Sequence, residues 1–149
     1  GERLWDIGAG SGSISVEWVL CGGEAIAIEV REDRAANVRS NAAAFGLAHR
    51  ITVIAGSAPW VVADLAAPDA VFIGGGLDAA MFDAVWARLA SGTRLVAHAV
   101  TLETEALLSE LHQRHGGELM RVEIAHAGPL GRYRSWEAAR PVVQWSVAR

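Results

Sequence analysis

The chain has very little cysteine, no long apolar run and no excess of positive charge. Cys21 is the only cysteine among 149 residues, which excludes an internal disulfide and any metal site built from several cysteines. No apolar run is long enough to cross a bilayer and no signal peptide is visible, so we expect a cytoplasmic protein that does not bind membranes. The formal net charge of -4 offers no general attraction to nucleic acid, and no nucleic-acid partner is expected.

The remaining composition is typical of one folded domain. Hydrophobic residues make up 52% of the chain and charged residues 20%, which predicts a globular protein with a sizeable core. Neither an internal repeat nor a low-complexity linker divides the sequence, so residues 1–149 are predicted to form a single domain. Because the chain opens with Gly1 rather than Met, close to its first predicted strand, we expect a module of a longer protein that lacks an initial helix.

The most informative stretch lies near the start of the chain. Residues 4–7 are predicted to end a buried strand, residues 8–12 to form a glycine turn, and residues from 13 onward to form a helix. Turn glycines let the backbone approach a ligand closely, and a helix N-terminus presents free N–H groups, so this succession predicts a nucleotide-cofactor site. The buried face of the helix is expected to include Ile14, Val19 and Leu20.

Four more strand–helix units are predicted before the pattern changes. Their strands are expected at residues 25–30, 51–54, 70–73 and 95–100. The helix after the second strand is expected to bury Phe45, a short helix is expected at about 60–65, and Thr101 can cap the last helix.

The end of the chain is predicted to reverse direction. Residues 119–125 and 142–147 are predicted strands without a helix between them, so the pair should be antiparallel, and residues 127–135 are expected to form a loop. Together the elements predict a Rossmann-like α/β fold with a mostly parallel seven-stranded sheet, one antiparallel strand and helices on both faces.

In open α/β sheets, ligands bind beyond the carboxyl ends of the strands. Glu29 ends the second strand, where a carboxylate can accept hydrogen bonds from both ribose hydroxyls of a nucleotide; a solvated strand end is the alternative. The candidate cofactor-binding residues at these strand ends are Asp6, Gly8, Ala9, Gly10, Ser11, Gly12, Glu29, Val30, Ser57, Ala58 and Gly74.

The glycine spacing separates two classes of cofactor. In the dinucleotide fingerprint G-x-G-x-x-G the third glycine would stand where this chain has Ser13. Here Gly8, Gly10 and Gly12 alternate, and Asp6 precedes the first of them by two residues. This pattern resembles motif I of the class I S-adenosylmethionine-dependent methyltransferases. The resemblance implies that the first loop holds the methionine part of the cofactor, that Glu29 binds ribose, and that S-adenosylhomocysteine is the product.

One position departs from that family. Many members have an acid after the third strand that binds the adenine amino group, whereas this chain has Gly56, Ser57 and Ala58 there. Either the Ser57 side chain or backbone groups of Ser57 and Ala58 are then expected to contact adenine.

Four segments narrow the resemblance further, namely residues 6–12, 56–59, 72–76 and 99–104. They look like those of the corrin-pathway methyltransferases that methylate carbon 15 of precorrin-6B and decarboxylate an acetate arm. The resemblance implies a tetrapyrrole substrate, a homo-tetramer and, in the aerobic pathway, an N-terminal methyltransferase domain in the same protein.

The candidate substrate-binding residues are Gly75, Gly76, Thr101, Arg132 and Arg134. The glycines leave open space for a bulky, flat acceptor, although a plain tight turn is the alternative. The two arginines are expected in a loop near the site, where they would bind substrate carboxylates; a solvated surface charge is the alternative.

Candidate proton-transfer groups are Glu103 and His98, both close to the end of the fifth strand. For Glu103, stabilising a helix N-terminus is the alternative role. No metal site is expected, because His112 and His115 lie one helical turn apart without an evident third ligand.

Three other functions are kept as alternatives. They are an NAD-dependent oxidoreductase, another class I methyltransferase acting on protein, RNA or a small molecule, and a non-catalytic module that retains the fold.

Overall fold

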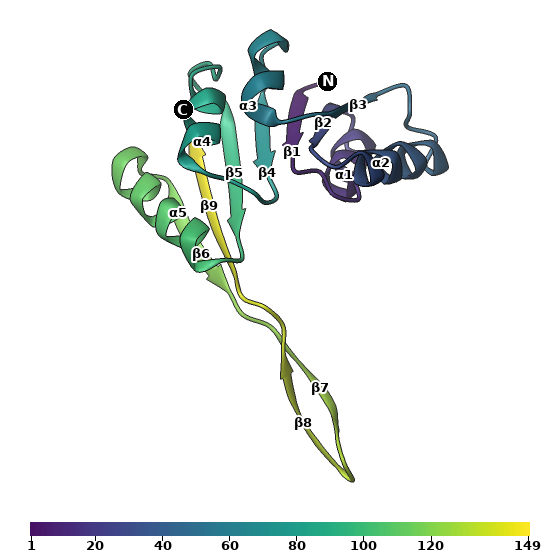
Figure 1. Ribbon diagram of the computed structural model, residues 1–149, viewed down its shortest axis with the longest axis vertical. Helices are drawn as coiled ribbons and strands as arrows, with labels where there is room; N and C mark the ends of the chain where they lie inside the picture. Colours follow the sequence, from purple (N-terminus) through teal and green to yellow (C-terminus); the bar gives the residue numbers. More distant parts are fainter.

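The computed structural model describes residues 1–149 and places seven strands in one sheet (Figure 1). Its strands are β1 (Arg3–Ile7), β2 (Glu24–Glu29), β3 (Ile51–Ala55), β4 (Ala70–Ile73), β5 (Arg94–Ala99), β6 (Glu118–Val122) and β9 (Val142–Ala148). Their order across the sheet is β3-β2-β1-β4-β5-β9-β6. Only β9 runs antiparallel to its neighbours β5 and β6, whereas the other neighbouring strands are parallel. The predicted fold class is confirmed.

Helices cover both faces of the sheet. The helical elements are α1 (Ser13–Leu20), α2 (Glu32–Ala44), α3 (Ala58–Val61) with the 3-10 turn η1 (Val62–Asp64), α4 (Ala79–Trp86) and α5 (Leu102–His115). Helices α1 and α2 bury Val16, Val19 and Val38 against one face of the strands. The remaining helices pack on the other face around a larger core, which includes Trp5, Ile73, Leu108, Leu111 and Trp145. None of the helices has the length and apolar character needed to cross a membrane.

The opposite face of β5, β9 and β6 carries no helix of this chain. Val96, His98 and Gln144 remain only half-buried there, and Met120 is 40% exposed. Buried side chains of the same strands, such as Leu95 and Trp145, belong to the core on the α5 side. The helices therefore cover the sheet unevenly, and the face of β5, β9 and β6 opposite α5 leaves both apolar and polar side chains exposed to solvent.

Two helices begin with side-chain caps that their sequences favour. The Thr104 N–H donates to Thr101 Oγ1 at 3.3 Å, as predicted for the start of α5, and the Met81 N–H donates to Asp78 Oδ1 at 2.8 Å at the start of α4. Acidic residues in the first turn of α5 and basic residues in its last turn also match the helix dipole.

The predicted buried face of α1 was wrong in part. Ile14 is 40% exposed and Leu20 is 55% exposed, whereas Ser15, Val16 and Val19 are buried. The cause is polar: Ser15 donates hydrogen bonds to the buried Asp6 carboxylate from both its hydroxyl and its N–H, which sets the rotation of the helix.

The prediction that Phe45 is buried was also wrong, since its side chain is 61% exposed. Helix α2 ends at Ala44, and the chain turns at Gly46 with a φ of 71°. The Leu47 N–H then donates to the Ala42 carbonyl at 2.8 Å, and Leu47 packs against the core that Phe45 was expected to fill.

Residues 127–135 do not form the predicted loop. They belong to a β-hairpin of β7 (Ala125–Leu130) and β8 (Tyr133–Ala138), which pair from Ala125 with Ala138 to Leu130 with Tyr133. Figure 1 shows this hairpin projecting far from the sheet. Its strands are almost entirely exposed, so they lack the alternation of buried and exposed residues by which a strand is predicted.

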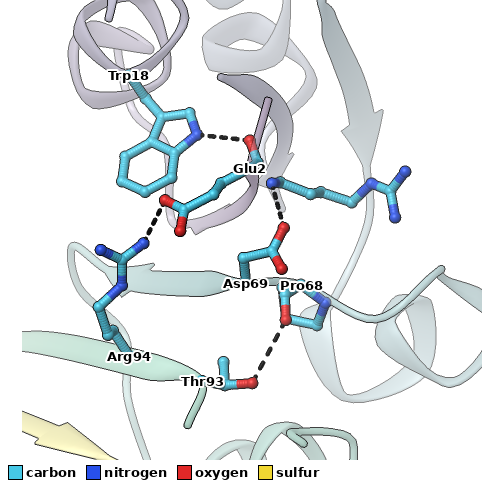
Figure 2. A network of polar contacts seen from close by, with 7 residues as sticks. Glu2, Trp18, Pro68, Asp69, Thr93 and Arg94 are labelled. Atoms are coloured by element: carbon cyan, nitrogen blue, oxygen red, sulfur yellow. Dashed lines mark hydrogen bonds and ion pairs between the residues drawn. The ribbon is translucent and has the colours of Figure 1, made fainter. Parts of the chain in front are cut away.

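A polar network ties the start of the chain to the amino ends of the strands (Figure 2). The Arg3 N–H donates to Asp69 Oδ2 at 2.7 Å, and Trp18 Nε1 donates to the Glu2 carbonyl at 3.1 Å. Arg94 forms an ion pair with Glu2. These contacts lie at the end of the strands opposite the glycine turn. They hold the start of β1 against helix α1 and against the amino ends of β4 and β5.

The larger core gives a first prediction. Leu111 is 0% exposed. Leu111→Ala should lower the free energy of unfolding by about 2–5 kcal/mol, because it leaves a cavity in the core. Leu102→Ala, on the same helix but 80% exposed, should change it by less than about 0.5 kcal/mol. Urea unfolding of both variants checks this, and equal losses would contradict the assigned core.

Candidate functional site

The turn between β1 and α1 requires its three glycines. Gly8, Gly10 and Gly12 have φ values of 71°, 60° and 77°, in the left-handed region that other residues avoid. A Cβ added to Gly8 would lie 3.1 Å from the Gly75 carbonyl oxygen, and one added to Gly12 would lie 2.6 Å from Val38 Cγ1. The turn is therefore packed tightly between the loop after β4 and helix α2.

Glu29 connects this turn to the end of β2. Its side chain is 3% exposed, Oε2 accepts a hydrogen bond from the Gly10 N–H at 3.0 Å, and Oε1 accepts one from the Arg31 N–H at 3.1 Å. An ionised carboxylate has about four lone-pair sites. Two acceptor sites thus remain for a ligand with paired hydroxyl groups, after the turn itself has been fixed.

Asp6 supports the turn from beneath. It is 1% exposed, and its Oδ2 accepts hydrogen bonds from Ser15 Oγ at 2.6 Å and from the Ser15 N–H at 3.1 Å. Burial raises the pKa of Asp6 and the nearby Glu29 charge adds to the rise, while the two bonds from Ser15 oppose it. The carboxylate faces α1 and does not line the pocket at the carboxyl ends of the strands. Asp6 therefore contributes to a ligand site by holding the turn in position.

A pocket of about 270 Å³ opens where β1, β2, β3 and β4 end. It contains only two ionisable side chains, Glu29 and Asp78, among otherwise apolar and small residues. The residues that line it are Ile7, Gly8, Ile28, Glu29, Val30, Gly56, Ser57, Ala58, Pro59, Gly75, Gly76, Asp78 and Met81. A buried carboxylate with free acceptor sites beside apolar residues suits the ribose and the base of a nucleoside.

Several predicted cofactor residues line this pocket and others frame it. Those in the lining are Gly8, Glu29, Val30, Ser57 and Ala58. Asp6, Ala9, Gly10, Ser11, Gly12 and Gly74 do not line it. The frame is nevertheless specific: Asn41 Nδ2 donates to the Ser11 carbonyl at 2.9 Å, and the Gly74 N–H donates to the Ile7 carbonyl at 2.9 Å.

The lining also includes residues that sequence reasoning missed or assigned elsewhere. Gly75 and Gly76, expected to bind substrate, share the pocket with the cofactor candidates. Pro59, Asp78 and Met81 were not predicted at all. The available signal for Asp78 was its place two residues after the glycines that follow the fourth strand, whereas Met81 resembles any core residue of a helix.

The proposed proton-transfer groups lie outside the pocket. His98 points to the open face of the sheet, where its Nε2 lies 2.9 Å from Gln144 Oε1 and its ring meets Phe72 edge-on at 4.9 Å. Thr101 caps α5 and Glu103 lies in the first turn of that helix.

Arg132 and Arg134 belong to a hairpin rather than to the predicted loop and do not line the pocket of their own chain, so their part in substrate binding stays a prediction. Arg134 is on β8, and Arg132 lies in the turn of the hairpin with its guanidinium 5.3 Å from the Tyr133 ring centroid. The hairpin carries both arginines away from the sheet (Figure 1). Arg31, two residues after Glu29, pairs with Asp33 at 2.7 Å.

Comparisons with known proteins agree with this geometry. The model of the precorrin methyltransferase domain matches residues 1–149. A Sinorhizobium sp protein named precorrin-6Y C(5,15)-methyltransferase [decarboxylating] is 50% identical over 149 residues, which cover 98% of this chain and 36% of that protein. The chain thus spans little more than a third of the length of this relative.

Two further similarities concern proteins of comparable size. A Pyrobaculum calidifontis protein named "Probable cobalt-precorrin-6B C(15)-methyltransferase (decarboxylating)" is 36% identical, over 95% of this chain and 76% of that protein. The crystal structure of the C-terminal domain of precorrin-6Y C5,15-methyltransferase from Rhodobacter capsulatus superposes with a TM-score of 0.96 at 58% identity, covering 100% of this chain and 81% of that one.

The tight packing of Gly12 gives a second prediction. Gly12→Ala should destabilise the fold by more than the roughly 1–2 kcal/mol expected for a left-handed alanine, because its methyl group also overlaps Val38. Gly46→Ala is the matched control, since Gly46 has a similar φ of 71° and nothing within 4 Å of an added Cβ. Chemical unfolding should rank Gly12→Ala clearly below the control; equal stabilities would refute the close packing.

The buried Asp6 gives a third prediction. Its pKa is raised above the ordinary value of 3.8, so its contribution to stability is full below that value and is lost as the pH rises through the higher value of the folded state. The free energy of unfolding of the wild type should therefore fall relative to that of Asp6→Asn over this rise in pH. Ser15→Ala removes the hydrogen bond of the hydroxyl group and keeps that of the backbone N–H, so the pKa of Asp6 should rise further and the loss should shift to higher pH. Unfolding measured across a pH series tests both, and a pH-independent difference would contradict the assignment.

Proposed function

Because this chain belongs to the precorrin methyltransferase domain family, we propose that it methylates carbon 15 of a precorrin-6B-type tetrapyrrole with S-adenosylmethionine. In the same proposal, the enzyme removes the carboxyl group of the ring C acetate side chain, as a step of cobalamin biosynthesis. The observation that carries the proposal is the pocket at the glycine turn, with Glu29 free to accept two further hydrogen bonds.

The names and lengths of the relatives support a division of the chemistry between two domains. The longer relative is named for carbons 5 and 15, and the chain matches little more than a third of it. The shorter relative is named for carbon 15 alone, and the chain matches most of it. The two names share carbon 15 and decarboxylation, which supports assigning these two activities to this domain, with carbon 5 left to an N-terminal methyltransferase domain.

The pocket residues suit each part of the cofactor. Glu29 would accept hydrogen bonds from the ribose hydroxyls, and the apolar Val30, Ala58 and Met81 would flank the base. Gly8, framed by the rest of the glycine turn, would leave room for the methionine part. When bound, S-adenosylmethionine supplies a methyl group on a positively charged sulfur.

The protein's own contribution is then mainly positioning. A carbon nucleophile of a conjugated tetrapyrrole needs little acid–base assistance, so alignment and exclusion of water provide most of the acceleration. A Cβ added to Gly75 or Gly76 would meet nothing within 4 Å, so these two lining residues would leave room for a flat acceptor. Glu103 and His98 remain candidates for moving a proton, and Thr101 remains a candidate for substrate binding.

We further propose a homo-tetramer in which the hairpin β7–β8 contacts other copies. An isolated two-stranded hairpin is marginally stable in water. This one exposes Leu130, Tyr133 and Trp136 by 62%, 67% and 75%. Packing against another copy would bury these side chains and would bring Arg132 and Arg134 to a substrate bound there.

Because this chain spans little more than a third of its longer relative, we propose that it is part of a longer protein. A helix from a preceding segment of that protein would then cover the open face of β5, β9 and β6. We also propose a cytoplasmic location.

The fourth prediction tests the activity itself. Incubation of precorrin-6B with S-adenosylmethionine and the chain should yield a product that has gained a methyl group and lost a carboxyl group, as detected by mass spectrometry. An unchanged substrate with the full-length protein would contradict the proposed reaction. Tight binding of NAD without binding of S-adenosylhomocysteine would contradict the proposed cofactor.

Glu29→Gln tests the binding site in the same proposal. Loss of a charge-assisted hydrogen bond to ribose should weaken S-adenosylhomocysteine about tenfold or more in calorimetry. Glu32→Gln is the matched control, because Glu32 is exposed on α2 and pairs with Arg39. Unaltered binding by Glu29→Gln would remove Glu29 from the site.

A further inference from the structure

We infer that Asp78 recognises the amino group of the cofactor's adenine. This inference rests on the proposed function, because it takes S-adenosylmethionine to be the ligand of the pocket. The chain has Ser57 after β3, where many class I methyltransferases have the acid that contacts adenine, and Asp78, which follows β4 and lines the same pocket, would supply that contact instead.

The carboxylate of Asp78 is held in place and yet has an unused oxygen. Its Oδ1 accepts the Met81 N–H at 2.8 Å, which fixes the side chain at the start of α4. Its Oδ2 has no hydrogen-bond partner, and the residue forms no ion pair with any arginine. A carboxylate oxygen is therefore available at the pocket wall without breaking an existing contact.

The composition of the pocket leaves few other acceptors. Glu29 and Asp78 are its only ionisable residues, and Glu29 is already bound to the backbone at the end of β2, where ribose is proposed to lie. Ser57 offers a hydroxyl group but no charge. Asp78 is therefore the charged acceptor in this pocket that remains free for an amino group.

Apolar residues that line the pocket together with these two acids can pack against a flat base. Ala58 and Pro59 come from α3 and Met81 from α4, and these two helices contact one another. A purine between such apolar side chains would direct its polar edge toward the pocket rim. An ionised acceptor there favours a base that presents an amino group and disfavours one that presents a carbonyl oxygen.

The test compares two ligands that differ only at this edge. Calorimetry is performed with S-adenosylhomocysteine and with S-inosylhomocysteine, in which the amino group is replaced by an oxo group. The wild type should prefer the amino ligand by about 10- to 100-fold. Asp78→Asn should reduce that ratio by about tenfold or more, because its amide can donate to the oxo group.

The variants separate recognition from stability. Asparagine caps helices about as well as aspartate, so Asp78→Asn preserves the start of α4. Asp83→Asn, on the same helix but outside the pocket lining, should retain the wild-type ratio.

Three outcomes would overturn the inference. The first is a wild-type ratio in Asp78→Asn, and the second is an equal weakening of both ligands by that variant. The third is a loss of preference in Ser57→Ala while Asp78→Asn retains it, which would assign the contact to Ser57. A wild type that binds neither ligand would instead refute the proposed function, and the inference with it.

Discussion

The site depends on the hydrogen bond between the Gly10 N–H and the Glu29 carboxylate. Its two partners are 19 residues apart in the sequence: Glu29 ends β2, and Gly10 lies in the turn after the adjacent parallel strand β1. The bond is short enough, at 3.0 Å, and buried enough to hold the glycine turn against β2. Because the same carboxylate is proposed to bind ribose, one side chain would both stabilise the turn and bind the ligand.

A second buried acid makes this arrangement possible. Asp6 holds helix α1 through Ser15, so the turn is fixed at its far end as well. Keeping a carboxylate buried is unfavourable unless it is hydrogen-bonded, and the raised pKa of Asp6 shows that the two bonds from Ser15 do not fully offset its burial. Burial of Asp6 therefore lowers the stability of the fold, while its bonds to Ser15 orient the turn. Such a loss of stability is common at binding sites.

Much of this could be predicted from sequence because the relevant signals are local. The alternate glycines, the acid at the end of β2 and the apolar strands all follow from spacing alone, and the structure places them in the expected sheet. The rotation of α1 could not be predicted, because it is set by a polar contact between Asp6 and Ser15 rather than by apolar periodicity. The hairpin escaped prediction for a related reason, since neither of its faces is buried within the chain.

The site residues divide in the same way. Pocket residues contributed by turns with a recognisable motif, such as Gly8 and Glu29, were predicted, whereas Asp78 and Met81 depend on how α4 meets α3 in three dimensions. Arg132 and Arg134 were assigned by charge, yet the strand pairing of the hairpin determines their location. Charge indicates what a residue can bind, but only the fold determines which site it reaches.

The most direct test is a crystal structure of the chain with S-adenosylhomocysteine. We expect both ribose hydroxyls within hydrogen-bond distance of the Glu29 carboxylate, with the Gly10–Glu29 bond retained and the base beside Val30 and Met81. A ligand bound elsewhere, or a Glu29 side chain turned away from both ribose and Gly10, would contradict it.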